Sequence, residues 1–182
     1  MVRGAMMARR FSLRRFARDR RGAAAVEFAF VAGPFIFLLM ALIELGLLFV
    51  VDALFHDATS QAGRLIRTGQ AQGAMSVEQF RTEICSRMSV FSDECEDKLI
   101  VDVRVIDQFM GESGPQLGTD EDGAIDQSDL RFVMGGPRSI ILVTAWLPRN
   151  VFSPLLAKSH ERVGRQRVLN ATTTFRNEPF GS

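Results

Sequence analysis

The sequence predicts an α+β protein in which a long N-terminal transmembrane helix continues into a spine helix and is followed by a small antiparallel sheet domain. An almost uncharged apolar run occupies residues 28–51, and three strand-like segments follow at 98–107, 139–148 and 167–175. Helices followed by a run of strands are typical of α+β architecture. We expect four parts: a basic leader (1–22), a transmembrane helix (23–51), a juxtamembrane helix (52–70) and an α+β domain (71–182).

Positive charge is concentrated before the apolar run. Residues 1–22 contain eight Arg and one acidic residue, Asp19, which gives this stretch a charge of +7, whereas the whole chain is only +1. Arginines on one side of an apolar run predict that this side stays in the cytoplasm and that the C-terminal part crosses the membrane. This orientation explains the arginines better than contact with nucleic acid, so we expect no nucleic-acid partner.

The apolar run is long enough to cross a bilayer. Residues 28–43 carry no formal charge, and after Glu44 the run resumes as far as Val51. As a helix, residues 28–51 would extend about 36 Å, against roughly 30 Å of hydrocarbon. A cleaved secretory signal peptide, cut near Val51, is an alternative. The apolar stretch of a signal peptide is usually shorter, and the small residues of its cleavage site follow that stretch. In this chain the small residues, Gly22 and the three alanines after it, come before the apolar run.

Glu27 is a carboxylate in the first turns of this run. It could simply be hydrated at the cytoplasmic interface, where an acidic side chain costs little. If the chain is instead cut after Gly22, Ala23 gains an α-amino group one helical turn from Glu27, and the two charges could pair within or between subunits. In an apolar surrounding such a pair would be strong and would set the axial register of neighbouring subunits. Glycine before the cut fits a narrow protease cleft because it lacks Cβ.

The segment RRFARDRRGAAAVEFAFVAGPFIFLLMALIELGLLF, which begins at Arg14, resembles the N-terminus of TadE-like proteins (TadE or TadF). These are minor pseudopilins of tight-adherence (Tad, or Flp) pilus systems. The resemblance is carried by the basic leader and by these residues: Gly22, Glu27, Phe28, Pro34, Ile43, Glu44, Leu45 and Gly46. The family usually has an apolar residue before the proline, where this chain has Gly33.

The resemblance implies a pilin-like fold and cleavage between Gly22 and Ala23 by an inner-membrane aspartic prepilin peptidase, with Glu27 and Phe28 acting in assembly. It implies as further partners other pseudopilins, the major Flp pilin, a secretion ATPase and an inner-membrane assembly platform, in addition to membrane lipid. The expected function is assembly of a Tad/Flp-type pilus for adhesion and biofilm formation. The expected location is the bacterial inner membrane, with a cytoplasmic N-terminus and a periplasmic C-terminal domain. Incorporation into the pilus itself is a further location that the resemblance allows. An uncleaved membrane-anchored accessory protein with an outer binding domain is the alternative.

Two features of the apolar run have two interpretations each. Pro34 removes the hydrogen bond to the Phe30 carbonyl and predicts a helix kink beside Gly33, although prolines are also common in ordinary membrane helices. Glu44 lies 17 residues after Glu27, about 260° around a helix, so the two acids do not share a face. Glu44 either contacts a partner or marks the outer boundary of the membrane, and we favour the boundary.

Beyond the membrane the sequence predicts a continued helix and a second, shorter one. Helical periodicity extends to about Thr68, so the long helix would measure roughly 70 Å from Ala23 and would end near Gly69 or Gly73. Ser76 followed by Gln79 fits a capping box, which predicts a short amphipathic helix ending near Val90.

The strand-like segments have different patterns. In 98–107, valines alternate with Asp102 and Arg104, which predicts a half-buried strand with a polar outer face. Residues 139–148 are apolar on both faces and predict a central strand stopped by Pro148. Residues 167–175 predict a third strand. The acidic segment 108–137 predicts a loop. Within it residues 120–129 resemble a calcium loop but lack the glycine and one ligand that an EF-hand requires.

Cys85 and Cys95 predict a disulfide in an oxidising compartment, joining the second helix to the start of the first strand; two buried thiols are the alternative. No zinc site is expected, because the two cysteines have no neighbouring histidine. His56, beside Asp57 and one turn from Asp52, is expected on a solvated face. Catalytic motifs are absent from the sequence, so we expect no enzymatic activity, no cofactor and no metal.

Overall fold

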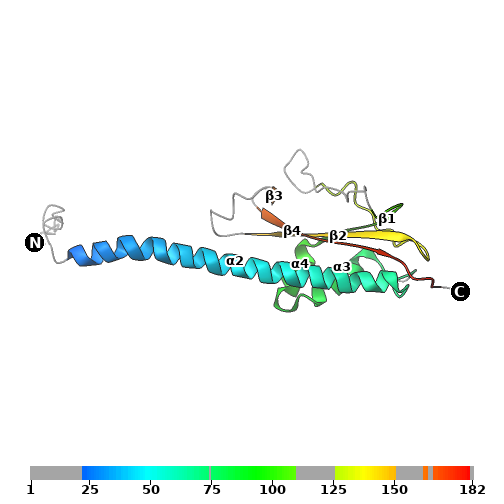
Figure 1. The fold of residues 1–182 in the computed structure, drawn as a ribbon, viewed down its shortest axis with the longest axis horizontal. Helices are drawn as coiled ribbons and strands as arrows, with labels where there is room; N and C mark the ends of the chain where they lie inside the picture. Colours follow the sequence, from blue (N-terminus) through cyan, green and yellow to red (C-terminus); the bar gives the residue numbers. More distant parts are fainter. Residues whose placement is uncertain (1–21, 74, 110–125, 151–161, 164–165, 181–182) are drawn as a thin grey trace, which may run out of the picture. The chain divides into compact units, whose positions relative to one another are not determined.

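The computed structural model describes residues 22–73, 75–109, 126–150, 162–163 and 166–180. The chain divides into two compact units, which meet in the sequence between Met40 and Ala41. Figure 1 shows the order of the elements: helix α2, helices α3 and α4, then a four-stranded sheet. The α+β class predicted from the sequence is confirmed.

Helix α2 is a single α-helix from Ala23 to Arg67. It joins the predicted transmembrane and juxtamembrane helices without interruption and ends within one residue of the predicted position. Gly69 follows with φ +78°, the left-handed conformation that commonly terminates helices at glycine. Pro34 lies inside α2, and the kink expected there stays a prediction.

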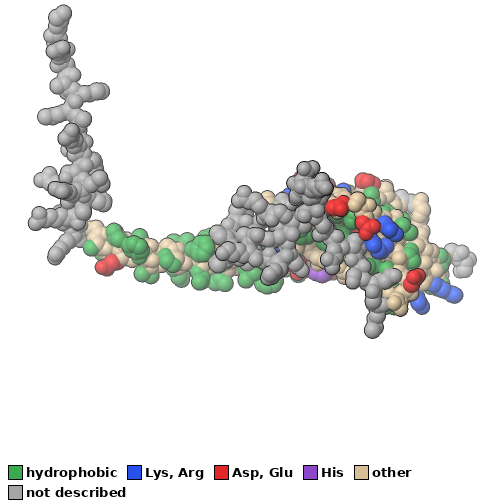
Figure 2. Space-filling view, turned by 90° about the horizontal axis from the view of Figure 1, so that it is seen from above, with side chains coloured by type: hydrophobic (Ala, Val, Ile, Leu, Met, Phe, Trp, Pro, Cys, Tyr) green, Lys and Arg blue, Asp and Glu red, His purple; other side chains and the backbone are tan. Residues whose placement is uncertain are grey.

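The part of α2 before Ala41 carries large apolar side chains that are mostly exposed, such as Phe28, which is 73% exposed, and Phe30, which is 77% exposed. Figure 2 shows these side chains as a nearly continuous apolar surface along the helix. Among the described residues α2 is the one helix long and apolar enough to cross a membrane. It is compatible with a single-pass membrane anchor.

The sheet belongs to the second unit and has the strand order β1-β2-β4-β3. Its strands are β1 (Ile100–Ile106), β2 (Ile140–Arg149), β3 (Arg162–Val163) and β4 (Gln166–Arg176), and all neighbouring pairs are antiparallel. Val143 at the centre of β2 pairs with Val103 on β1 and with Thr173 on β4. The predicted central strand is therefore confirmed.

The sequence predicted that Pro148 would stop the central strand. This prediction was wrong, because β2 continues to Arg149. The last residue of β2 that pairs with β1 is Trp146. At Pro148 only β4 lies alongside, through Val168, so the missing N–H of proline is tolerated as it is on an edge strand.

The main core lies between one face of the sheet and residues 41–67 of α2, the outer part of this helix. Residues of α2 at helical spacing are fully or almost fully buried: Val51, Phe55, Ala58, Ala62 and Ile66. They join a cluster with alternate residues of β1, β2 and β4 and with apolar residues of α3 and α4. Gly63 brings α2 close to the sheet, since a Cβ at this position would lie 3.0 Å from the ring of Phe175.

Helix α3 (Val77–Ser86) begins with the predicted capping box: the Ser76 hydroxyl accepts from the Gln79 N–H, and Gln79 Oε1 accepts from the Ser76 N–H. It ends at Ser86, earlier than expected. A short 3-10 turn, η2 (Ser89–Phe91), and helix α4 (Ser92–Lys98) follow. The sequence did not predict α4, because Cys95 is its one buried residue and a single apolar residue makes no periodicity.

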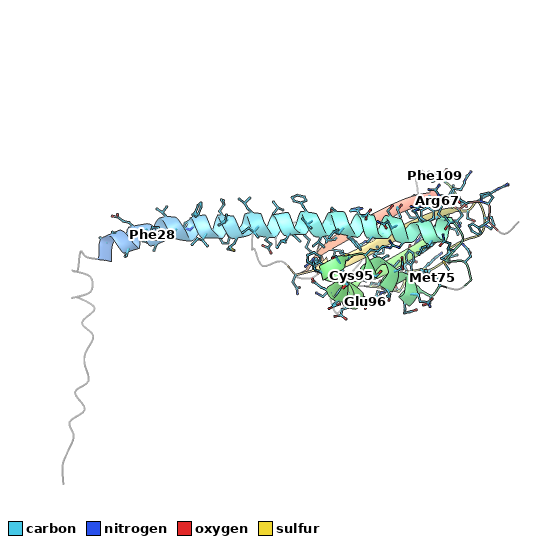
Figure 3. All side chains as sticks on the ribbon, turned by 90° about the horizontal axis from the view of Figure 1, so that it is seen from below. Phe28, Arg67, Met75, Cys95, Glu96 and Phe109 are labelled. Atoms are coloured by element: carbon cyan, nitrogen blue, oxygen red, sulfur yellow. A yellow bond between two sulfur atoms is a disulfide. The ribbon has the colours of Figure 1, made fainter. Side chains whose placement is uncertain are left out.

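The predicted disulfide between Cys85 and Cys95 is confirmed, with a Cα–Cα distance of 5.4 Å. Cys85 is on α3 and Cys95 is on α4, so the bond joins two helices (Figure 3). The expectation that it would join a helix to the start of the first strand was wrong, since that expectation placed Cys95 after the last helix. Both cysteines are fully buried in the main core.

The polar face predicted for β1 is not solvated. Asp102 is 0% exposed and accepts two hydrogen bonds from Arg104, from Nε at 2.7 Å and from Nη2 at 2.8 Å. It also accepts from the backbone N–H of Arg131 at 2.8 Å. Residues 131–133, predicted as loop, run beside β1 and exchange two backbone hydrogen bonds with Val103. This segment covers the open edge of the sheet.

Part of the acidic segment lies outside the described residues, including 120–125 of the sequence that resembles a calcium loop. At its described end, hydrogen bonds from Ser128 lower the pKa of Asp126. His160 also lies outside the described residues.

Candidate functional site

The first candidate site is the start of α2. Gly22 immediately precedes the helix, Ala23 is its first residue, and Glu27 and Phe28 occupy its second turn with exposed side chains. Because α2 is helical from Ala23 onwards, residues 23 and 27 are one turn apart. This arrangement places a backbone nitrogen at the helix end and a carboxylate on the neighbouring turn.

Three glycines of α2 and its start have open space around them. A Cβ added at Gly22, Gly33 or Gly46 would meet no atom within 4 Å. The fold of this chain therefore does not require glycine at these positions, in contrast to Gly63, which the sheet approaches closely. In membrane helices, small residues allow another helix to approach.

Glu44 is half-buried, and its side chain is engaged in an interaction. It belongs to the second unit, with the outer part of α2 and the sheet. Its role as a boundary marker of the membrane stays a prediction.

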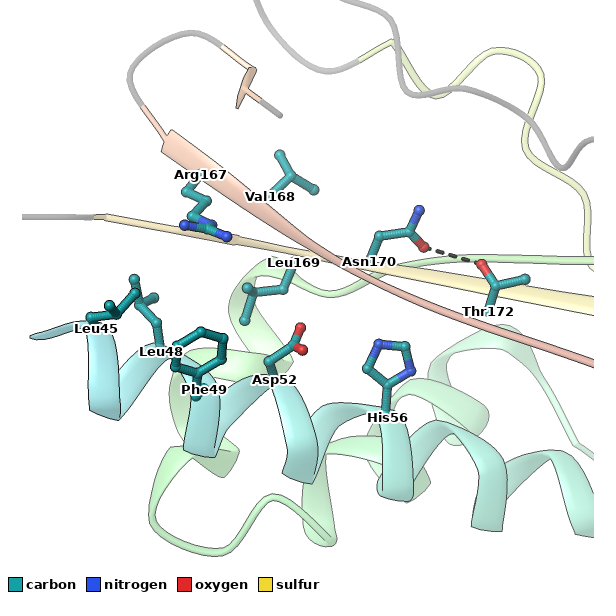
Figure 4. A pocket seen from close by; sticks show the side chains of 10 residues that line it. All are labelled: Leu45, Leu48, Phe49, Asp52, His56, Arg167, Val168, Leu169, Asn170 and Thr172. Carbon is teal, nitrogen blue, oxygen red and sulfur yellow. Dashed lines mark hydrogen bonds between the residues drawn. The ribbon is translucent and has the colours of Figure 1, made fainter. Parts of the chain in front are cut away.

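A second candidate site is a pocket of about 390 Å³ between the outer part of α2 and strand β4. Its apolar wall comes from α2 and includes Leu45, Leu48 and Phe49. In Figure 4, Arg167 extends from β4 towards α2, while Asp52 and His56 extend from α2 towards β4. The volume is within the range of about 300–1,000 Å³ that is typical of small-ligand sites.

The pocket contains one acidic and one basic side chain, Asp52 and Arg167. Among the described residues, neither Asp52 nor Arg167 makes a side-chain hydrogen bond or ion pair, and Nε of Arg167 is buried without a hydrogen-bond partner. At the opposite rim, Oγ1 of Thr172 donates to Oδ1 of Asn170 at 3.2 Å. The pocket thus presents one acidic and one basic group whose hydrogen-bonding capacity is unused.

No group of three or more His, Cys, Asp and Glu side chains within the described ranges could hold a metal ion. His56 is exposed and lines the pocket together with Asp52. The described residues therefore offer no arrangement from which a catalytic mechanism can be derived.

A comparison with protein families matches residues 22–64 to the family described as TadE-like protein. This N-terminal segment is TadE-like. The match covers most of α2 and begins at Gly22, directly before the helix. It confirms the resemblance that the sequence motifs indicated.

The match of this segment to the TadE-like family suggests a protein associated with Tad pili. Searches of curated proteins and of solved structures found no match. The family match ends at residue 64, so the sheet domain and the pocket that it shares with α2 are interpreted from their own geometry.

The sequence did not identify Arg167 as part of a site. Asp52 and His56 are one turn apart on a helix and could be grouped by spacing, but Arg167 lies more than a hundred residues later. Only the packing of α2 against β4 brings the three side chains to one pocket. A single arginine at the start of a predicted strand does not indicate that its side chain will line a pocket.

Proposed function

We propose that this TadE-like chain is a minor pseudopilin, cut by a prepilin peptidase between Gly22 and Ala23, that acts in assembly of a Tad/Flp-type pilus. The observation that carries the proposal is the coincidence of three boundaries. The family match begins at Gly22, helix α2 begins at Ala23, and the basic leader ends at the same point. Cleavage there would release a chain whose first residue starts an uninterrupted apolar helix.

The environment of Gly22 supports cleavage at this position. No atom lies within 4 Å of a Cβ added at residue 22, so packing within the chain does not explain the glycine. A protease cleft that accepts only a residue without a side chain would explain it. The basic leader before it has the charge expected of a segment that stays in the cytoplasm, where the peptidase would meet it.

The exposed position of Glu27 supports a role in assembly. After the cut, the new ammonium group of Ala23 and the carboxylate of Glu27 would stand one turn apart at the end of an apolar helix. Within a bundle of such helices, water is excluded and an ion pair between neighbouring subunits would fix their axial register. Phe28 beside it would contribute apolar contact area to the same interface.

The disulfide supports an extracytoplasmic location for the second unit. Disulfides persist in the periplasm and are rare in the reducing cytosol. The buried bond between Cys85 and Cys95 therefore agrees with the orientation derived from the arginines, with the sheet domain outside the inner membrane. We propose that this domain acts by binding other pilus components and has no catalytic role.

The intact mass of protein extracted from membranes tests the proposal. Loss of residues 1–22 would support the pseudopilin, and a new N-terminus at Ala23 read by Edman sequencing would locate the cut. A full-length mass would favour an uncleaved membrane-anchored accessory protein. Loss through about residue 53 would indicate a secreted protein released by signal peptidase. Either of the last two results would overturn the proposed processing.

A further inference from the structure

We propose that the pocket between α2 and β4 binds the head group of a phospholipid that carries a primary amine, with its phosphate at Arg167 and its ammonium at Asp52. The inference requires only that α2 spans a bilayer. It does not depend on cleavage or on a pilus.

The pocket lies at the outer end of the apolar run. Leu45, Leu48 and Phe49 line the pocket, and Asp52 is the first acidic residue after the run ends at Val51. A helix that spans the membrane with this run places these residues where hydrocarbon meets head groups. Lipid is therefore the molecule present at the highest local concentration at the mouth of the pocket.

The apolar wall fits the upper part of a lipid. Phe49 is 65% exposed, and Leu48 is buried where the pocket meets the sheet. Together with Leu45 they form an apolar surface that lies below Arg167 and beside Asp52 in Figure 4. A ligand with an apolar part on one side and charges on the other matches this order.

Arg167 fits the phosphate. Arg167 is half-buried and lines the pocket, and its Nε is buried without a hydrogen-bond partner, so a bound anion would give a counter-charge to a cation that has none among the described residues. Arginine binds phosphate through two parallel N–H donors and is weakly hydrated, which suits a partly buried site. Binding would replace the lost hydration of the side chain with a charge-assisted hydrogen bond.

Asp52 decides which phospholipid is favoured. Its carboxylate lines the same pocket and, among the described residues, has no side-chain partner. A head group with net negative charge would be repelled by it, whereas a primary ammonium would be attracted and could donate hydrogen bonds to it. A quaternary ammonium has the charge but no N–H donor. The geometry therefore favours phosphatidylethanolamine over phosphatidylglycerol and phosphatidylcholine.

Native mass spectrometry of the full chain tests the inference. The purified protein is equilibrated in mixed micelles that contain equal amounts of phosphatidylethanolamine, phosphatidylglycerol and phosphatidylcholine with identical acyl chains. We expect preferential retention of one phosphatidylethanolamine. We expect Arg167→Gln and Asp52→Asn each to lower this retention about tenfold, as loss of one charge-assisted contact would.

Matched variants separate the pocket from general charge effects. Arg176→Gln removes an exposed arginine from the same strand, and Asp57→Asn removes an exposed acid from the same helix, and neither residue lines the pocket. Both should bind lipid as the wild type does. Arg167→Lys keeps the positive charge and should retain more lipid than Arg167→Gln, while near-UV circular dichroism of each variant verifies the fold.

Three results would overturn the inference. The first is equal retention of lipid by the wild type and Arg167→Gln, and the second is displacement of phosphatidylethanolamine by phosphatidylglycerol. The third concerns a chain in which His56 is replaced by a photo-crosslinking amino acid. In membranes, this residue would crosslink to another protein chain and form no lipid adduct. Failure of lipid binding would leave the proposed cleavage at Gly22 untouched, and an uncut chain would leave lipid binding untouched, so the two proposals fail separately.

Discussion

The ring of Phe180 lies directly against Gly69, so that a Cβ added at Gly69 would come within 2.5 Å of Cγ of the ring. Two further contacts hold the same segment at the end of α2. The backbone N–H of Glu178 donates to the carbonyl of Arg67 at 2.9 Å, and the Glu178 carboxylate lies 3.4 Å from Nε of Arg67. Residues 178–180 therefore pack against the C-terminal end of α2.

Gly69→Ala should destabilise the second unit more than Gly73→Ala. Both glycines have positive φ, +78° and +73°, which costs an alanine about 1–2 kcal/mol. Only at Gly69 does the new methyl group also collide with a ring, because a Cβ at Gly73 would meet nothing within 4 Å. Urea unfolding of the detergent-solubilised chain measures the difference, with the fluorescence of Trp146, the single and buried tryptophan, as the signal. Equal losses of stability would contradict a contact between Phe180 and Gly69.

Replacing both Cys85 and Cys95 by serine should lower the free energy of unfolding by about 2–3 kcal/mol. The bond closes a short loop, with a sequence separation of 10, and most of its effect comes from restricting the unfolded chain. The same urea experiment on wild type with and without a reductant gives an independent value. The serine variant should be insensitive to the reductant, and a wild type that is equally insensitive would mean that the bond does not form.

Much of this fold could be predicted because its signals are local. The apolar run and the helical periodicity predict α2, and the Ser76–Gln79 pair predicts the start of α3. Two-residue alternation predicts β1, and a continuous apolar run predicts the central strand β2. What could not be predicted depends on tertiary contacts. The alternation of Asp102 with valines predicts a polar outer face for β1, yet Arg104 and the residues around Arg131 cover Asp102 completely. Alternation identifies the two faces of a strand but not what covers the second face.

The candidate sites divide in the same way. Gly22 and Glu27 could be proposed from the sequence because a cleavage motif is linear and needs no folded partner, and their roles stay predictions. The pocket could not be predicted, because Arg167 and Asp52 come to line one pocket only through the packing of β4 on α2. Helix α4 was missed for another reason: its sequence, SDECEDK, is mostly charged, and it is stabilised by acids in its first turn, by Lys98 in its last turn and by the disulfide.

Asp102→Ala should be destabilising, by about 2–3 kcal/mol, because it removes the fully buried carboxylate that accepts two hydrogen bonds from Arg104. It also removes the acceptor for the Arg131 N–H and so loosens the segment that covers the edge of β1. Asp129→Ala is the matched control, since its pair with Arg131 is exposed and should contribute less than about 1 kcal/mol. Hydrogen exchange of the Val103 and Val133 amides measures the loosening. Similar stabilities for the two variants would argue against a structural role of Asp102.

Ser76→Ala should cost about 1 kcal/mol, the usual effect of removing an N-cap side chain. It should also raise the pKa of Glu78, which is held below its ordinary value of 4.5 by a backbone hydrogen bond and then by the hydrogen bond from Ser76. Because the folded pKa is lowered, the stabilisation by ionised Glu78 is complete above the unfolded value and is lost as the pH falls through the folded value. NMR titration of the Glu78 carboxyl in both proteins measures the shift. An unchanged pKa in the variant would exclude the contribution of Ser76.

Gly22→Ala should slow the removal of the leader, because the new methyl group meets open space in this chain and can be resisted only by the peptidase. Intact mass at successive times after induction follows the reaction. Gly33→Ala is the matched control, since that position is equally open within the chain but lies inside α2, away from the cut. Cleavage of Gly22→Ala at the wild-type rate would remove the argument that the glycine serves a protease cleft.

Glu27→Ala should leave cleavage largely intact but impair pilus assembly. The carboxylate is exposed in the single chain, so its loss should not destabilise the fold, whereas a subunit interface would be left with an unpaired ammonium at Ala23 in an apolar surrounding. Leaving one member of a buried pair alone costs about 3–5 kcal/mol, enough to reduce incorporation more than a hundredfold. The amount of chain in sheared pilus fractions, normalised to cleaved chain in membranes, measures incorporation. Glu27→Asp keeps the charge and should incorporate better than Glu27→Ala. Wild-type incorporation of Glu27→Ala would show that Glu27 is no more than a hydrated interfacial acid, and the register of the subunits would then have to come from apolar packing alone.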